Sequence, residues 1–312
     1  MPGSAPALIT PTAPPSRGPG QPVRGTSESP QPRSSSLVTS TQSTPDHAEA
    51  EQAPVLLDVT DGVAVVTLNR PDAMNSLDVA TKEALLTVLE RVAADPGARC
   101  VVLRGTGKAF CVGQDLKEHI TLLQNGDERL WETVVRHYNP IVELIATMNK
   151  PVIAAINGVA AGAGAAFAFA ADIRVMAQGA GVNLAFSGIG LSCDSGSSWS
   201  LPRLIGIAKA KDLLFFPRTV KSAECLELGM VNQVVPAEEL DTVVMDLART
   251  LAAGPTLSYG AMRQAIAYSA GHDLSSSLAK EGEFMQTTGS SADHSGAVDA
   301  FIAKERPVFQ GR

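Results

Sequence analysis

Hydrophobic residues along the chain occur in short runs separated by longer amphipathic segments. Four apolar runs rich in β-branched residues, at 55–59, 63–68, 99–104 and 151–156, have the length of buried strands. The first two flank Asp61-Gly62, a pair typical of a tight hairpin turn. Helical patterns separate the later runs, which favours a mixed or parallel sheet covered by helices.

Helical spacing of apolar residues predicts the elements between and after these strands. Asp78 is suited to cap a helix that stops before Pro96-Gly97. The glycine-rich segment 105–116 indicates a loop, and a helical pattern follows at 127–148. Further helices are predicted at 209–216, 223–228, 241–253, 256–269, 273–288 and 298–304.

Residues 159–171 depart from the amphipathic pattern, because almost all of them are Ala, Gly, Phe or Val. A helix here has no polar face and must be buried on all sides. Gly162 and Gly164 near its start carry no Cβ, so the backbone can approach a ligand closely. The first N–H groups of a helix lack partners and can stabilise an anion or an oxyanion. The alternative is that these glycines only permit tight helix packing.

Composition and charge narrow the possible functions. The chain has 312 residues, 45% of them hydrophobic, which suffices for a large core. A net charge of −7 argues against a nucleic-acid partner. Residues 1–53 are dominated by Pro, Ser, Thr, Gly and Gln, so we expect them to be disordered. No apolar run is long enough for a bilayer, and the four cysteines lack paired spacing. We therefore expect a cytoplasmic protein with no membrane association, no disulfides and no metal site.

Several motifs in the same chain order resemble those of the crotonase, or enoyl-CoA hydratase/isomerase, superfamily. They are Leu68-Asn-Arg-Pro71, Ala109-Phe-Cys-Val-Gly-Gln-Asp-Leu116, Lys150-Pro-Val-Ile-Ala-Ala-Ile-Asn-Gly158, Ala171-Asp-Ile173, the segment from Ser222 to Val231, and the ending from Ala300 to Gly311. The resemblance covers about residues 54–312. It implies an α/β fold in which a spiral core of ββα turns, at 54–247, precedes a C-terminal helical trimerisation region at 248–312. It also implies a homotrimer or a hexamer.

The resemblance implies an acyl-CoA thioester as the substrate, so that CoA is part of the substrate and not a separate cofactor. The backbone N–H groups of Val112 and Ala163 would form the oxyanion hole. The nucleotide part of CoA would lie near Asp72-Ala73 and near Gly113-Gln114-Asp115. For Asp115 there is an alternative, which is that the side chain only orders its own loop.

Hydratases of the superfamily use two glutamates, and the corresponding positions here hold Ala166 and Phe186. Neither side chain can accept a proton, so ordinary hydration is not expected. Asp194 lies in the loop 190–196, which resembles the loop of the isomerase branch and in particular of the 1,2-epoxyphenylacetyl-CoA isomerases. By this resemblance Asp194 would move one proton between two carbons of the acyl group while the oxyanion hole holds the enolate.

Apolar surroundings would raise the pKa of Asp194 towards neutral pH, and the candidates for these surroundings are Phe167, Phe169 and Phe186. The alternative is that Asp194 caps the next helix. Asp172, by contrast, is expected to be structural, because the resemblance places it at the end of the buried helix.

An enoyl-CoA isomerase is therefore the favoured function. The alternatives are an enoyl-CoA hydratase, another Asp-dependent crotonase such as a naphthoate-forming cyclase, a non-catalytic acyl-CoA-binding protein, and a structural subunit of a larger β-oxidation assembly.

Overall fold

The computed structural model describes residues 53–312. The disorder predicted for residues 1–53 therefore falls almost entirely outside the described residues. Two sheets form the core. The larger has the order β1 (Val55–Thr60), β2 (Val63–Leu68), β3 (Cys100–Gly105), β5 (Val152–Ile156), β7 (Ile173–Ala177) and β10 (Gln233–Val235). The smaller has the order β4 (Ala109–Cys111), β6 (Val159–Ala161), β8 (Gly181–Asn183) and β9 (Thr219–Lys221).

The pairing confirms the predicted mixed sheet. In the larger sheet β1 and β2 are antiparallel and all other neighbours are parallel. Asp61 and Gly62 between β1 and β2 have φ angles of 52° and 80°. Hairpin turns of this kind need positive φ at both central residues, which Asp-Gly tolerates better than most pairs.

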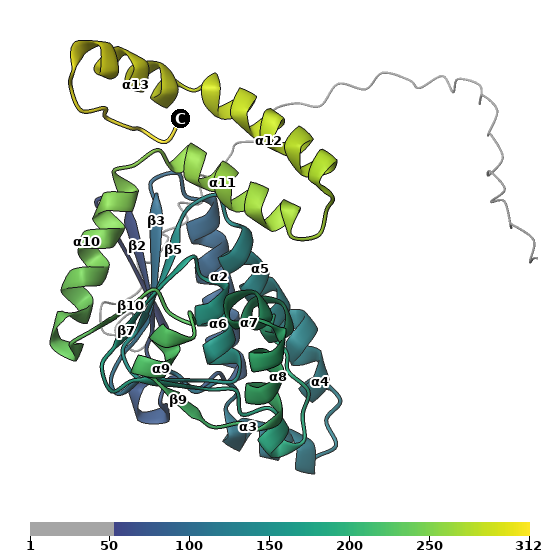
Figure 1. Cartoon of the computed structure of the whole chain (residues 1–312). Helices are drawn as coiled ribbons and strands as arrows, with labels where there is room; N and C mark the ends of the chain where they lie inside the picture. The colour runs from purple at the N-terminus through teal and green to yellow at the C-terminus, as the bar shows by residue number, and fades with distance from the viewer. Residues whose placement is uncertain (1–52) are drawn as a thin grey trace, which may run out of the picture. The chain divides into compact units, whose positions relative to one another are not determined.

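Helices cover both faces of the larger sheet. On one face α10 (Leu240–Ala252) packs against β2, β3, β5 and β7, and α2 (Val79–Ala94) and α5 (Asn139–Thr147) lie on the other face (Figure 1). The Asp78 side chain accepts a hydrogen bond from the Thr81 N–H, so the predicted cap of α2 is confirmed.

The apolar segment 159–171 divides into a strand and a helix. Residues 159–161 pair with β4 and β8 as β6, and only then does α6 (Ala163–Ala170) begin. Every residue of α6 except the last is buried, as expected for a helix with no polar face. The prediction of a helix from residue 159 was therefore wrong for residues 159–161, which form a strand. The predicted loop 105–116 likewise contains β4.

The remaining predicted helices are present with small shifts at their ends. The pattern at 127–148 comprises α4 (Arg129–Thr133), a π-helical turn η2 (Val134–Tyr138) and α5. One helix was missed, α3 (Leu116–Gln124). The others are α7 (Ser197–Ile205), α8 (Ile207–Phe215), α9 (Ser222–Glu227), α11 (Thr256–Ser269), α12 (Leu274–Gly289) and α13 (Ala292–Ala303), with 3-10 turns η1 (Pro71–Ala73), η3 (Ser187–Ile189) and η4 (Ala237–Glu239).

Asp172 links the buried helix to the sheet and to the C-terminal helices. One carboxylate oxygen accepts a 2.7 Å hydrogen bond from the Val152 N–H, and the other lies 2.7 Å from Nε of Arg263 on α11. Arg263 also donates to the backbone carbonyls of Ile145 and Lys150. These contacts agree with the structural role expected for Asp172.

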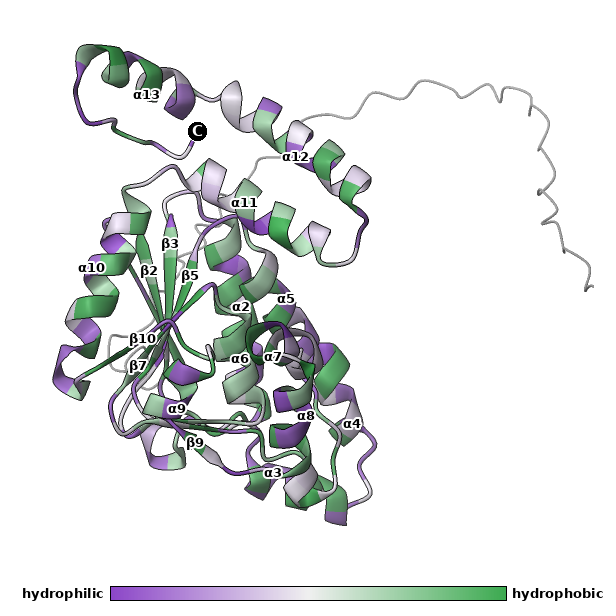
Figure 2. Ribbon diagram, viewed as in Figure 1, coloured by the Kyte–Doolittle hydropathy of each residue, from purple (hydrophilic) through white to green (hydrophobic). Residues whose placement is uncertain are grey.

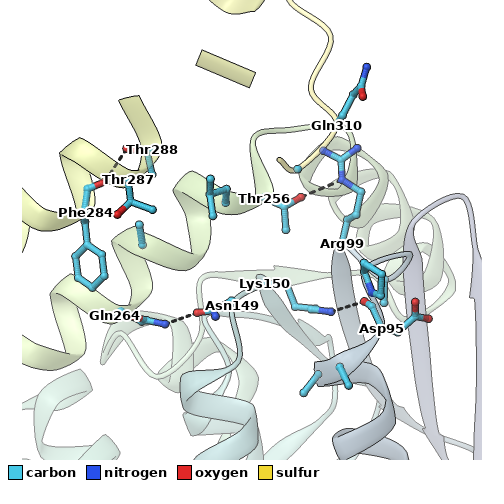
Figure 3. A pocket seen from close by; sticks show the side chains of 17 residues that line it. Asp95, Arg99, Asn149, Lys150, Thr256, Gln264, Phe284, Thr287, Thr288 and Gln310 are labelled. Carbon is cyan, nitrogen blue, oxygen red and sulfur yellow. Dashed lines mark hydrogen bonds between the residues drawn. The ribbon is translucent and has the colours of Figure 1, made fainter. Parts of the chain in front are cut away.

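A hollow of about 380 Å³ lies between the end of α2 and the helices α11 and α12 (Figure 3). Arg99 borders it and donates to Thr256 Oγ1, to the Gly254 carbonyl and to the Phe309 carbonyl, which ties the C-terminal tail to the core. None of the predicted site residues lines this hollow.

The C-terminal helices expose many large apolar residues. Figure 2 colours the hydrophobic residues of α12 and α13 green. They include Leu274, Leu278, Met285, Phe301 and Ile302. The side chain of Phe301 is 84% exposed, so it is not part of the core of this chain. The trimer or hexamer and the division of the chain at residue 247 stay predictions. Among residues 53–312 no helix combines the length and the apolar character needed to cross a bilayer.

Candidate active site

A cavity of about 150 Å³ brings together the three residues predicted to be catalytic, Val112, Ala163 and Asp194. It is bordered by the end of β4, the start of α6, the π-helical turn before α5 and the loop that precedes α7. The other lining residues are Gln114, Leu116, Tyr138, Gly162, Ala185, Phe186, Ile189 and Leu191.

Two glycines allow the Val112 loop and the start of α6 to touch through their backbones. A Cβ on Gly113 would lie 2.8 Å from the Ala161 carbonyl oxygen and 3.3 Å from the Ala163 nitrogen. A Cβ on Gly164 would lie only 2.2 Å from the Cys111 carbonyl oxygen. Any side chain at either position would push the two segments apart. The contact of Gly164 with Cys111 is the tight packing that the sequence left open as the alternative, whereas a Cβ on Gly162 would meet nothing within 4 Å. The packing at Gly113 and Gly164 also brings the Val112 and Ala163 peptides to the same cavity.

The two N–H groups differ in their present partners. Within the described residues no backbone or side-chain group accepts a hydrogen bond from the Ala163 N–H, which is the first of helix α6. The Val112 N–H makes a long bond of 3.3 Å to the Met74 carbonyl. An oxyanion is a stronger acceptor than a carbonyl and can compete for that donor.

Asp194 lies in the loop before α7 and is half-buried. Burial raises the pKa of this carboxyl above its usual value, although a 2.8 Å hydrogen bond from Ser195 Oγ acts in the opposite direction. Ser195 is buried and has a φ of 52°, an unusual conformation for a residue other than glycine. The raised pKa confirms the predicted direction, and the Ser195 bond fixes one carboxyl oxygen.

The alternative role of Asp194 as a helix cap is wrong. Helix α7 begins at Ser197, its cap residue is Gly196, and no side chain makes a capping hydrogen bond there. Asp194 contributes only its backbone carbonyl, which accepts from the Ser197 N–H at 2.9 Å.

Ala166 and Phe186, at the positions that the resemblance assigns to the two hydratase glutamates, are both buried. Phe186 lines the cavity as expected, whereas Phe167 and Phe169 do not. Asp194 is the one carboxyl side chain among the described residues that line this cavity.

Tyr138 also lines the cavity, and no motif in the sequence pointed to it. Its ring is buried and packs edge-on against Phe167, with the ring centres 6.1 Å apart. Its hydroxyl donates a hydrogen bond to Gln114 Oε1. The π-helical turn that carries Tyr138 ends just before Asn139-Pro140, and Pro140 lacks the N–H that regular α-helical bonding needs. Turns of this kind are frequent at functional sites.

The two segments predicted to hold CoA lie side by side. The Leu77 N–H donates to the Gly113 carbonyl and the Asp115 N–H donates to the Leu77 carbonyl, at 2.8 and 3.2 Å. Ala73 lies on η1, just before Met74, and does not line the cavity. The contact of both segments with CoA stays a prediction.

The Asp115 carboxylate is already fully engaged. It accepts from the N–H groups of Lys117 and Glu118 as the cap of α3, from Ser76 Oγ and from Arg70 Nη2. Burial alone would raise the pKa of Asp115, but these hydrogen bonds outweigh it and lower the pKa. The contacts favour the alternative in which Asp115 orders its loop.

Comparison with known proteins decides the family. Residues 58–312 match the enoyl-CoA hydratase/isomerase family. The chain belongs to this family. The 1,2-epoxyphenylacetyl-CoA isomerase of Escherichia coli is 40% identical over 258 residues, which are 83% of this chain and 98% of that protein. The short-chain-enoyl-CoA hydratase of Clostridium acetobutylicum is 32% identical over 253 residues, 81% of this chain and 95% of the relative.

A solved structure supports the same assignment. The enoyl-CoA hydratase from Bacillus anthracis superposes with a TM-score of 0.78 at 30% identity, covering 83% of this chain and all of that one. The crotonase-like α/β fold with C-terminal helices is thereby confirmed. Similarity to both isomerases and hydratases leaves the reaction to be argued from the side chains of this member of the enoyl-CoA hydratase/isomerase family.

Proposed function

We propose that the protein is an acyl-CoA double-bond isomerase that uses Asp194 as its acid and base. The observation that carries this proposal is that Asp194 supplies the single carboxyl group among the described residues lining a cavity that Val112 and Ala163 also line. The similarity to 1,2-epoxyphenylacetyl-CoA isomerase supports an isomerase, and the family supports an acyl-CoA thioester as substrate.

In the proposed reaction the ionised Asp194 removes a proton from C2 of a 3-enoyl thioester. The electron pair of the broken C–H bond enters the conjugated system, and negative charge develops on the thioester oxygen. The N–H groups of Val112 and Ala163 stabilise that charge. Protonated Asp194 then returns the proton to C4, which leaves a double bond between C2 and C3.

The raised pKa of Asp194 suits both halves of this reaction. A carboxyl group of ordinary pKa is a weak base and holds its proton too briefly to return it at neutral pH. Burial brings the pKa closer to the working pH.

Hydration would require a group that activates water and a separate source of the proton for C2. Among the described residues, no second carboxyl group lines the cavity. A hydratase and an acyl-CoA-binding protein that catalyses neither reaction are outcomes that the following experiment distinguishes from an isomerase.

The test is turnover of a trans-3-enoyl-CoA by the purified protein, with hydration of crotonyl-CoA measured in parallel. The proposal expects conversion to the 2-enoyl-CoA without hydration. A substrate deuterated at C2 should also deliver part of its label to C4, because one carboxyl group carries it. Hydration without isomerisation would contradict the proposal, and binding without either reaction would favour an inactive binder.

A further inference from the structure

Gln114 lies between the site cavity and a second cavity of about 290 Å³. The second cavity is formed by α2, α3, α4 and the π-helical turn, and Lys82, Glu118, Thr133 and His137 are among its lining residues. Gln114 lines both cavities, so its side-chain amide connects the groups on the two sides.

Lys82 fixes the orientation of that amide. Its ammonium group has only donors, and the side chain is 1% exposed. Nζ lies 3.2 Å from Gln114 Oε1 and 2.8 Å from Thr133 Oγ1. Because a cation cannot donate to an NH2 group, the amide atom facing Lys82 must be the oxygen.

The opposite side of the amide leads to the same orientation. Gln114 Nε2 lies 3.5 Å from Glu118 Oε2 and 3.5 Å from the Asp115 carbonyl oxygen. A carbonyl oxygen can only accept a hydrogen bond, and so can the oxygen of an ionised carboxylate. Two independent sets of neighbours therefore direct Oε1 of Gln114 towards Lys82 and Tyr138.

This orientation determines what Tyr138 can offer the substrate. A phenol has one proton, and Tyr138 donates it to Gln114 Oε1. Burial, together with the charge of Asp194, raises the pKa of Tyr138 well above its usual value, so the hydroxyl keeps its proton. Tyr138 Oη can then only accept a hydrogen bond from the cavity.

We propose that Lys82 and Gln114 hold Tyr138 as an acceptor facing the cavity, and that this acceptor favours the protonated form of Asp194. The inference rests on the proposed function, in which protonated Asp194 must keep its proton until C4 is ready to receive it. Tyr138 is a positioning residue in this scheme, because it acts on the substrate through Asp194.

Few other charges bear on Asp194. Tyr138 and Asp194 are the only ionisable side chains among the described residues that line the site cavity. Helix α6 contributes only Ala, Gly and Phe, and Ser195, whose side chain donates a hydrogen bond to Asp194, is neutral. Lys82 and Glu118 line the second cavity on the other side of Gln114, and the Asp115 carboxylate is engaged by Ser76 and by the start of α3.

The test measures the pKa of Asp194 by NMR in protein labelled with 13C at the aspartate carboxyl carbon, with Asp194→Asn used to assign the resonance. In Gln114→Met the hydroxyl of Tyr138 loses its acceptor and is free to donate to the Asp194 carboxylate. The pKa of Asp194 should then fall by about one unit. Gln114→Asn, whose amide is too short to reach Tyr138, should give the same shift and serves if the first variant folds poorly.

The deciding observation is the double variant. If Gln114 acts through Tyr138, Gln114→Met should leave the pKa of Asp194 unchanged when Tyr138→Phe is already present. An equal fall in both backgrounds would overturn the inference, as would a pKa that does not change in the single variant. Tyr268→Phe, a tyrosine far along α11, is the matched control and should not shift the resonance.

Kinetics separates this inference from the proposed function. Tyr138→Phe should lower kcat about 10-fold with KM within twofold, and the acid limb of its pH–rate profile should move with the pKa seen by NMR. If the enzyme is active and the pKa of Asp194 does not change in Gln114→Met, the inference about Tyr138 is refuted and the proposed function stands. The NMR measurement needs no turnover, so it tests Tyr138 even in a protein that fails to isomerise the substrate.

Discussion

Gly164→Ala tests whether the contact between β4 and α6 builds the oxyanion hole. The added Cβ would lie 2.2 Å from the Cys111 carbonyl oxygen and 2.7 Å from the Cys111 Cβ. Because these are packed core atoms and not the flexible end of a side chain, the two segments have to separate by about 1 Å to regain ordinary contact distances.

That displacement separates Val112, next to Cys111, from Ala163, next to Gly164. A misplacement of about 1 Å costs roughly 100-fold in rate, and loss of one oxyanion donor costs about 100- to 1,000-fold. Overpacking of the core should lower the free energy of unfolding by about 1 to 3 kcal/mol. We therefore expect a folded protein of lower melting temperature whose kcat falls at least 100-fold.

The assay is isomerisation of a trans-3-enoyl-CoA, with thermal unfolding measured on the same samples. Gly282→Ala is the matched control, because Gly282 is exposed within α12 and a Cβ there meets nothing within 4 Å. It should keep the wild-type rate and gain about 0.5 to 1 kcal/mol of stability. A Gly164→Ala enzyme with the wild-type kcat would refute the assignment of the two N–H groups.

Three further outcomes follow from the side-chain contacts. Because burial raises the pKa of Asp194 above that of the unfolded chain, its ionisation in the fold destabilises the protein as pH rises through the folded pKa. Asp194→Asn should therefore have a higher melting temperature than wild type at pH 7, and the difference in melting temperature should shrink below pH 4. A difference that is the same at pH 7 and below pH 4 would contradict the raised pKa of Asp194. Asp172→Ala removes the Val152 and Arg263 contacts and should lower the free energy of unfolding by about 1 to 3 kcal/mol, measured by urea denaturation, with little change in kcat. Arg99→Met removes three hydrogen bonds to the C-terminal region and should speed proteolytic cleavage of the tail; equal cleavage rates would show that the tail is held by other contacts.

Features that depend on neighbouring residues in the chain were predictable. The Asp61-Gly62 hairpin and the Asp78 cap each follow from a few adjacent side chains and their preferred dihedral angles. The strands β4 and β6 were not, because each has three residues and pairs with segments distant in the sequence. Helix α3 was missed although Leu116, Ile120 and Leu123 have helical spacing, and in the structure all three are exposed.

The residues of the candidate site likewise fall into those that could be predicted from the sequence and those that could not. Asp194 and the two backbone donors were named from a motif resemblance, and the structure places all three around one cavity. Tyr138 could not be predicted as a site residue. Its position depends on a π-helical turn, and the direction in which its hydroxyl donates depends on Gln114, which Lys82 orients. Such a role arises only when residues from α2, the π-helical turn and the loop before α3 meet.

The central claim is that one carboxyl group, that of Asp194, carries the proton. The most direct measurement is the kcat of Asp194→Asn for a trans-3-enoyl-CoA that the wild type converts, together with the Kd of the same ligand. Loss of a general acid and base should lower kcat by about 100- to 10,000-fold while the Kd stays within a few fold, because the amide keeps the size of the carboxyl group. A variant that isomerises at close to the wild-type rate would contradict the claim.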